Sequence, residues 1–219
     1  MKDGVFTAKA ALDGKHSGAW LCDLGASSSS LEGYYAKNEK FLDRKGVISM
    51  GHGAGAAYRS KRVECGRISF AGYTLKKPRI HFPIDNIDTV AAADKIGNLG
   101  NTEFRNFVLY VDYANEQMIV EQGDKFGMEF PEDRSGLQIM RSDNGGYEVW
   151  LVSEGTPAAN AGFMAEDKLT SVNGIDEADI AGISAIRELL SEKAGTKYVI
   201  AITRGEKTVE LKLTLADLF

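Results

Sequence analysis

The chain has 219 residues, of which 43% are hydrophobic, and a formal net charge of −5. This length accommodates two small domains that can each bury a core, and the composition is that of an ordinary globular protein. No apolar run approaches the roughly 18 residues that a membrane span needs, and no basic segment indicates nucleic-acid binding, so we expect neither a membrane span nor a nucleic-acid partner.

The first residues and the cysteines bear on the cellular compartment. Met1–Gly4 lacks a basic segment followed by an apolar one, so no signal peptide is recognisable, although an export signal removed upstream would leave the same start. Cys22 and Cys65 are expected to be buried free thiols, with a single disulfide as the alternative. Metal-ligand spacing is absent from the three histidines, so we expect no metal and no cofactor: His16, His52 and His81.

Residues 1–122 are predicted to form a mainly β domain, because short apolar runs alternate with glycine turns. Short helices are expected at Leu31–Leu42 and Thr102–Phe107. The predicted strands are Val5–Leu12, Ser17–Cys22, Val47–Met50, Tyr58–Cys65, Ile68–Phe70, Thr74–Leu75, Arg79–Phe82, Phe107–Asp112 and Gln117–Glu121. The last two strands are expected to pair as a hairpin.

One segment of this domain places a carboxylate on a tight turn directly after an apolar strand. The run is Trp20-Leu21-Cys22-Asp23-Leu24-Gly25-Ala26-Ser27. An ionised Asp23 among apolar neighbours is costly unless hydrogen bonds or a shared proton stabilise it, so we interpret it as a candidate catalytic residue. The alternative is a strand-ending aspartate that caps its own turn.

A glycine-rich segment indicates a second functional element. Gly51-His52-Gly53-Ala54-Gly55 lies between two predicted strands. We expect Gly51, His52, Gly53 and Gly55 to form the tip of a mobile hairpin, a flap that closes over a substrate. No helix beginning with Lys-Ser or Lys-Thr follows this segment, which argues against a nucleotide site.

The residue pattern changes after residue 122 and indicates a second domain. Residues 123–134 carry glycine, proline and several charges and are predicted to be a linker, followed by an α+β domain over residues 135–219. Its short helix is expected to begin at Pro157 and to end at Gly162. A second helix is expected over Ile183–Lys193, because Ile183, Ile186, Leu189 and Leu190 recur at helical spacing and Ala194-Gly195 ends the pattern. The predicted strands are Gly136–Met140, Tyr147–Val152, Lys168–Val172, Lys197–Arg204 and Thr208–Leu215.

The second domain resembles a PDZ domain of the bacterial type. The resemblance rests on three blocks in the family's order, which are Val149–Gly162 (VWLVSEGTPAANAG), Asp167–Gly174 (DKLTSVNG) and Ile202–Gly205 (ITRG). Glu166 departs from the glycine that the family usually has before the aspartate.

The PDZ resemblance implies a groove that binds peptide termini by adding a strand to the sheet. Its helical wall would carry Ile183 and Ile186. The loop and edge strand that receive the terminus through backbone N–H groups would be formed by Gly136, Leu137, Gln138 and Ile139. The alternative is a groove that packs against the first domain or the linker and binds nothing.

The first domain resembles the retropepsin-like aspartic proteases, in particular the bacterial ones that carry a PDZ domain behind them. Asp23-Leu24-Gly25-Ala26-Ser27 stands where that family has Asp-Thr-Gly-Ala-Ser. The segment Ile96–Glu121 resembles the second hallmark, which is an apolar-apolar-Gly turn, a short helix and a closing hairpin. The resemblance implies that Asp23 is catalytic and that Gly25, Ala26 and Ser27 support it, with the Ser27 hydroxyl bonded to the aspartate.

An aspartic protease needs two facing carboxylates that share one proton. This chain has one such turn, so the resemblance implies a homodimer, or a second lobe that lies outside this chain. Leu24 replaces the threonine whose hydroxyl braces the two aspartates in that family. A catalytically inactive protease fold, kept as a scaffold whose PDZ domain binds peptides or a partner protein, is therefore the alternative.

These observations predict a mainly β, two-domain protein: a retropepsin-like lobe over residues 1–122, a linker over 123–134 and a PDZ domain over 135–219. The predicted activity is that of an aspartic endopeptidase acting on peptide or protein substrates. The resemblance favours an exported location, periplasmic or in the cell envelope, and leaves a cytoplasmic one open.

Overall fold

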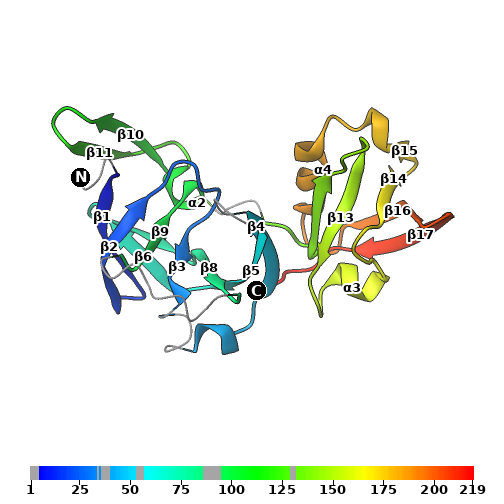
Figure 1. Ribbon diagram of the computed structural model, residues 1–219, viewed down its shortest axis with the longest axis horizontal. Coiled ribbons are helices and arrows are strands. Elements are labelled where there is room, and N and C mark those ends of the chain that lie inside the picture. Colours follow the sequence, from blue (N-terminus) through cyan, green and yellow to red (C-terminus); the bar gives the residue numbers. More distant parts are fainter. Residues whose placement is uncertain (1–4, 34, 36–39, 53–56, 86–94, 129–131) are drawn as a thin grey trace. The chain divides into compact units, whose positions relative to one another are not determined.

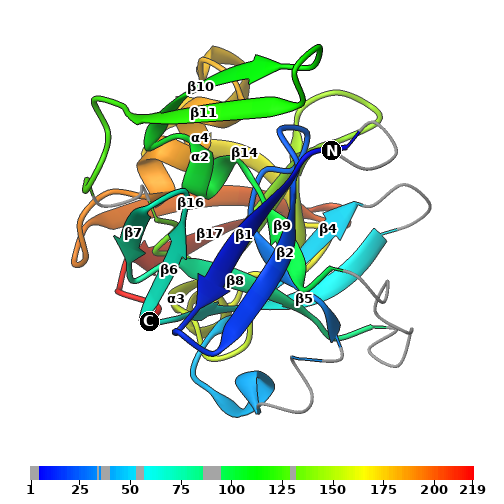
Figure 2. The ribbon, with the colours of Figure 1, turned by 90° about the vertical axis from the view of Figure 1, so that its left-hand side faces the viewer.

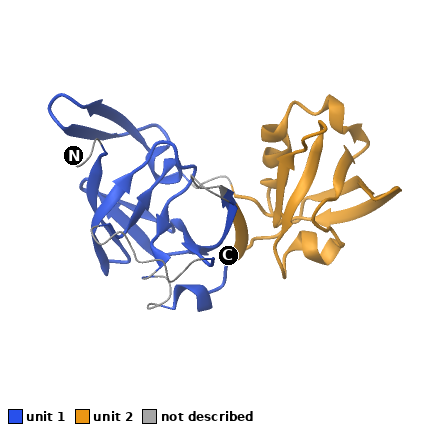
Figure 3. Cartoon of the chain, viewed as in Figure 1, with its two compact units in different colours: residues 1–46, 51–130 blue, residues 47–50, 131–219 orange. Residues whose placement is uncertain are grey.

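The computed structural model describes residues 5–33, 35, 40–52, 57–85, 95–128 and 132–219. By their contacts, the residues form two compact units (Figure 3). Unit 1 comprises residues 1–46 and 51–130, and unit 2 comprises residues 47–50 and 131–219. The domain boundaries expected from the sequence remain a prediction.

Unit 1 is built almost wholly from strands (Figure 1). Its helical segments in the described residues include the 3-10 turn η1 (Phe41–Asp43) and the short helix α2 (Asn101–Phe104). The strands of residues 5–122 are β1 (Thr7–Leu12), β2 (His16–Cys22), β3 (Ser30–Leu31), β4 (Val47–His52), β5 (Ala57–Glu64), β6 (Arg67–Phe70), β7 (Tyr73–Lys76), β8 (Arg79–Pro83), β9 (Gly97–Leu99), β10 (Phe107–Asp112) and β11 (Gln117–Gln122). By their contacts, residues 47–50 of β4 belong to unit 2.

The first nine strands form one sheet, in the order β4-β5-β8-β3-β9-β2-β1-β6-β7 (Figure 2). β9 lies between β2, with which it pairs in parallel, and β3, with which it pairs antiparallel. Gly97 permits this approach, because a Cβ there would lie 2.4 Å from the Ser30 carbonyl oxygen and 2.7 Å from the Trp20 ring. The sheet thereby brings the end of β2, where Asp23 follows, beside the end of β9.

A single apolar core supports this arrangement. Phe41 stacks on Phe82 with ring centroids 4.4 Å apart. The fully buried side chains of unit 1 also include Leu12, Trp20, Leu31, Ile68, Ile80 and Leu99. Because Leu99 ends β9 and Trp20 lies two residues before the end of β2, core packing holds both strands next to the candidate site.

Unit 2 has an α+β arrangement. Helix α3 (Pro157–Ala161) is capped by Thr156 and ends at Gly162, whose φ of 89° is left-handed, and α4 spans Ile183–Leu190. A second 3-10 turn, η2, spans Glu177–Asp179. The strands are β12 (Leu137–Arg141), β13 (Tyr147–Val152), β14 (Lys168–Val172), β15 (Ile175–Asp176), β16 (Lys197–Arg204) and β17 (Lys207–Thr214). They are ordered β12-β13-β14-β16-β17, with β15 pairing β14, so β12 is an edge strand.

The mainly β, two-domain class expected from the sequence is confirmed, but one predicted helix has the wrong bounds and two short strands of unit 1 were missed. The helix expected over Leu31–Leu42 is wrong at both ends: Leu31 lies in β3 and Phe41–Asp43 forms a 3-10 turn, while residues 34 and 36–39 lie outside the described residues. Strands β3 and β9 were not predicted. With two and three residues they are too short for alternation to reveal them, and their partners are distant in sequence.

Candidate active site and peptide groove

Asp23 lies on a turn that its own carboxylate helps to close. The backbone N–H groups of Gly25 and Ala26 donate to its Oδ1, at 2.9 and 3.2 Å, and the side chain is half-buried. Gly25 suits this position, since a Cβ there would lie 3.1 Å from the same oxygen. The turn leaves the other carboxylate oxygen, Oδ2, for a different partner.

That partner is Asn98 on β9, 75 residues further along the chain, whose side-chain Nδ2 donates to Oδ2 at 3.2 Å. The next residue, Leu99, accepts a hydrogen bond from the Asp23 backbone N–H at 3.0 Å. Asp23 is therefore held at both its backbone and its carboxylate by consecutive residues of β9. Sequence reasoning did not single out Asn98, because only the parallel pairing of β2 with β9 places it there.

The rest of the Asp23 loop is fastened to the start of α2. The backbone N–H of Asn101 donates to the Ala26 carbonyl at 2.9 Å, and the Asn101 side chain donates to the Leu24 carbonyl at 2.8 Å. Thr102 donates to the Ser27 carbonyl through both its N–H and its hydroxyl, at 3.1 and 2.9 Å. The loop is thus preorganised, a requirement for a group that must be held in a productive geometry.

The structure corrects one expectation about the support of Asp23. The donors to its carboxylate are Gly25, Ala26 and Asn98, and the Ser27 hydroxyl is not among them in the described part of the chain. Ser27 is exposed, and its backbone carbonyl accepts the hydrogen bonds from Thr102. Leu24, next to the aspartate, is 52% exposed, which leaves an apolar side chain in solvent beside the carboxylate.

The expected flap can be followed only in part. Gly51 and His52 are the last residues of β4, and β5 resumes at Ala57. Gly51 allows a close approach to Tyr58, because a Cβ there would lie 2.8 Å from the Tyr58 ring. Gly53 and Gly55 lie outside the described residues, so the flap remains a prediction.

Three alternative nucleophiles in unit 1 are buried or partly buried. Ser60 Oγ lies 3.0 Å from His81 Nδ1, but Ser60 is only 1% exposed, and burial, followed by the charge of Arg62, lowers the pKa of His81 to about 4. Cys22 and Cys65 are free thiols, and burial raises their pKa to about 11 and about 12. A seryl or thiolate nucleophile is therefore not supported here.

Unit 2 contains an apolar pocket between the edge strand β12 and helix α4. Three residues predicted for the peptide groove, Leu137, Ile139 and Ile186, lie in its wall, and Ile183 packs against the same core. The wall also includes Val149, Phe163, Leu169, Val172, Leu189, Leu190, Tyr198 and Ile200, which sequence reasoning had not assigned to the groove. Gln138 is not in the pocket wall, and its side-chain amide is bonded instead to the backbone N–H and carbonyl of Met50 at 2.7 and 2.6 Å.

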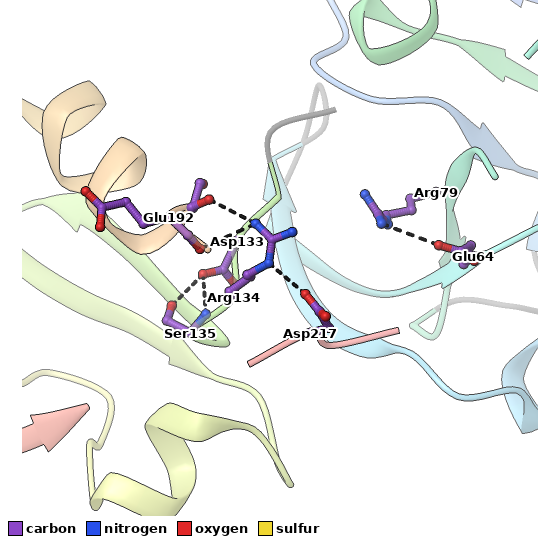
Figure 4. Close-up of polar contacts among 8 residues, drawn as sticks. Glu64, Arg79, Asp133, Arg134, Ser135, Glu192 and Asp217 are labelled. Atoms are coloured by element: carbon purple, nitrogen blue, oxygen red, sulfur yellow. Dashed lines mark hydrogen bonds and ion pairs between the residues drawn. The ribbon is translucent and has the colours of Figure 1, made fainter. Parts of the chain in front are cut away.

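The loop before β12 carries its own carboxylate (Figure 4). Asp133 accepts hydrogen bonds from the N–H groups of Ser135 and Gly136, both at 2.9 Å, and the Leu137 N–H donates to the Ser135 hydroxyl at 2.9 Å. Arg134 fastens this loop, because its Nε donates to Asp217 at 2.7 Å and its Nη1 donates to the Ser191 carbonyl at 3.0 Å. The N–H groups of Gly136 and Leu137, expected to be free, are thus engaged within the chain.

With this geometry in view, a comparison with protein-family models matches residues 126–215 to the PDZ domain. The second unit contains a PDZ domain. Its edge strand β12, helix α4 and the pocket between them are the parts from which a PDZ groove is built, so binding of a peptide or protein is the expected property of this PDZ domain.

Comparison with curated proteins finds the Serine protease Do-like HtrA of Lactobacillus helveticus, 34% identical over 82 residues, which are 37% of this chain and 19% of that protein. The chain therefore spans about a fifth of the length of that relative. Solved structures also match part of this chain. A retropepsin-like aspartic protease from Rickettsia conorii matches with a TM-score of 0.43 and 19% identity, over 55% of this chain and 84% of that one. The serine endoprotease from Yersinia pestis matches with a TM-score of 0.38 and 12% identity, over 80% and 62%.

The expected order, a mainly β lobe followed by a PDZ domain, is confirmed. Across the residues that the structure describes, no helix is long and apolar enough to span a membrane. Within those same residues, no three His, Cys, Asp or Glu side chains gather as metal ligands would.

Proposed function

We propose that this protein is an aspartic endopeptidase whose PDZ domain captures peptide substrates. The observation that carries the proposal is the position of Asp23, half-buried on a preorganised turn and held by Asn98 from a second strand. Two such carboxylates would share one proton: the ionised one activates a water molecule and the protonated one polarises the scissile carbonyl. The second carboxylate comes from another copy of Asp23, or from a lobe outside this chain.

A face of unit 1 supports pairing with a second copy. Tyr110 and Ile119 lie opposite each other on β10 and β11 and are 52% and 53% exposed, and Val108 on the same face is 44% exposed. A second apolar group, Leu24, is exposed beside Asp23. Burying such side chains against a twofold-related copy would favour association by about 1.5 to 3 kcal/mol for each fully buried side chain.

We expect Ile119→Lys to weaken dimerisation at least about tenfold and to reduce peptide cleavage in parallel, since a lysine on this face must be desolvated on pairing. Sedimentation velocity over a range of concentrations measures the association. Met128→Lys is the control, because Met128 is 63% exposed elsewhere in unit 1 and its replacement should change neither quantity. A protein that is strictly monomeric at all concentrations and still cleaves peptides would contradict the pairing.

The PDZ groove is proposed to bind the apolar end of a substrate chain. Leu189 is half-buried in the pocket wall, whereas its neighbour Glu188 is exposed on the same helix. We expect Leu189→Lys to weaken the binding of an apolar peptide at least about tenfold, and Glu188→Lys to leave it nearly unchanged.

Fluorescence anisotropy of labelled peptides measures that binding, with each peptide prepared as a free acid and as a C-terminal amide. A free carboxylate has to displace Asp133 and Ser135 from the N–H groups of Gly136 and Leu137, so the two forms report on how the terminus is held. Equal binding by both Lys variants would show that the peptide does not occupy this pocket.

A second candidate function is that of a peptide-binding scaffold without catalysis. Leu24 favours it, because an exposed leucine cannot supply the hydroxyl that braces paired aspartates in the retropepsin-like family. On this hypothesis the PDZ groove binds peptides while the lobe hydrolyses none. An exported location, in the periplasm or the cell envelope, is part of the proposal for either function.

A further inference from the structure

Glu103 is a buried carboxyl group that the proposed reaction does not use. It is the third residue of α2 and 0% exposed, and burial raises its pKa from 4.5 to about 7, although the hydrogen bond from Ser29 opposes this shift. The Ser29 hydroxyl donates to Oε2, while Oε1 has no hydrogen-bond partner among the described residues. A buried carboxyl group with one unsatisfied oxygen is costly to ionise, so its proton has structural consequences.

A short chain of hydrogen bonds links Glu103 to Asp23. Ser29 Oγ, which donates to Glu103, accepts the backbone N–H of Gly100 at 2.9 Å. Gly100 directly follows the two residues that hold Asp23: Leu99 through the Asp23 backbone N–H, and Asn98 through the carboxylate. One side chain therefore connects Glu103 to the end of the strand that positions the candidate catalytic group.

The groups around Glu103 do not compensate the negative charge that it would carry when ionised. From the loop before β3 comes the Ser29 hydroxyl, and from the segment after β5 the Cys65 thiol, whose pKa Glu103 helps to raise. Asn106, beyond the end of α2, donates to the backbone carbonyl of Glu103 and not to its carboxyl group. Ionisation thus places a negative charge in the core with the Ser29 hydroxyl as its one side-chain donor and with its own backbone N–H, which favours a shift of α2 or the entry of water.

We propose that Glu103 is a positioning residue for Asp23, acting through Ser29 and Gly100 on the strand end that carries Asn98. With Glu103 protonated, the first turn of α2 stays packed against the Asp23 loop. With Glu103 ionised, the same turn is strained and the hold of Asn98 on the Asp23 carboxylate loosens. The consequence for catalysis rests on the proposed endopeptidase function, whereas the structural link does not.

The link is tested by following amide signals of the full chain by 15N NMR from pH 5 to pH 9. We expect the Gly25 and Gly100 backbone amides and the Asn98 side-chain amide to shift together with an apparent pKa of about 7. Glu103→Gln keeps an acceptor oxygen for Ser29 but cannot ionise, so this common inflection should vanish. Glu121→Gln, an exposed site on β11, should retain it.

Ser29→Ala provides a second variant in case Glu103→Gln does not fold. It leaves Glu103 able to titrate but breaks the connection, so the signals of Gly25 and Asn98 should lose the inflection. No common inflection near pH 7 in the wild-type protein, or one that persists in Glu103→Gln or in Ser29→Ala, would overturn the proposal.

Catalysis gives a separate readout. If the wild-type protein cleaves peptides, Glu103→Gln should remove the limb near pH 7 from the profile of kcat/KM, with little change in KM at acidic pH. A wild-type protein without activity defeats the endopeptidase proposal alone, because the NMR titration still decides whether Glu103 controls the Asp23 site.

Discussion

Replacing Asp23 with asparagine is expected to reduce peptide cleavage by roughly a thousandfold or more at acidic to neutral pH. An amide can still accept the hydrogen bonds from Gly25 and Ala26, at 2.9 and 3.2 Å, so the turn should persist. It cannot take up or release the proton that a paired carboxylate must exchange with water and substrate. The initial rate of hydrolysis of a fluorogenic peptide library, measured with far-UV circular dichroism on the same samples, separates lost chemistry from lost structure.

Asp124→Asn is the matched control, because it removes an exposed carboxylate from unit 1 outside the Asp23 turn. We expect its rate to equal that of the wild-type protein. Cleavage that survives Asp23→Asn at the wild-type rate would exclude Asp23 as the catalytic group. Peptide binding without any cleavage by the wild-type protein would favour the scaffold function instead.

Gly100→Ala is expected to destabilise unit 1 by about 2 to 3 kcal/mol and to disturb the site at the same time. A Cβ at this position would lie 2.5 Å from both the carbonyl carbon and the carbonyl oxygen of Ser28, and backbone atoms cannot rotate away as a side chain can. Because the φ of Gly100 is −113°, the cost is steric and does not arise from backbone strain. Chemical denaturation measures the change in the free energy of unfolding.

Gly72→Ala is the comparison variant, because at Gly72 the backbone conformation and not the available space requires a glycine. Gly72 has a φ of +81° and open space where a Cβ would be, so alanine there costs about 1 kcal/mol through its backbone conformation alone. We expect Gly100→Ala to cost more than Gly72→Ala and to lower cleavage by the folded protein, which Gly72→Ala should not do. Equal destabilisation by the two variants would mean that the Asp23 loop and α2 are less tightly apposed than the distances indicate.

Local residue patterns were sufficient to predict much of the fold. The hairpin of β10 and β11 was predictable because two apolar runs flank a polar turn, and the helix ending at Gly162 because a glycine there adopts a left-handed φ of 89°. Strands β3 and β9 were not predictable, since they have only two and three residues. Their pairing also depends on partner strands that are distant in sequence. The helix predicted over Leu31–Leu42 begins too early for a related reason, because Leu31 pairs with Gly97 in the sheet, whereas Gly33 and Tyr35 inside the predicted range are helical.

The candidate site also has features that were predictable from the sequence and features that were not. The position of Asp23 at the end of a strand and on a glycine turn follows from residues adjacent in sequence, and so do the apolar residues Leu137, Ile139 and Ile186 that line the pocket of unit 2. The free N–H groups expected at Gly136 and Leu137 did not follow, because a nearby Asp133 satisfies one and Ser135 the other. A pattern of residue types does not show which donor a short side chain reaches.

The sequence by itself therefore determined that this protein is mainly β, that a carboxylate stands on a turn after an apolar strand, and that a PDZ domain follows. Only the tertiary structure decided which groups act on that carboxylate. Asn98 reaches Asp23 across 75 residues, and Glu103 reaches Ser29 across 74. Local patterns of hydrophobicity and turn residues specify strands and their ends, whereas contacts of this range arise only when parallel strands pair and the core closes around them.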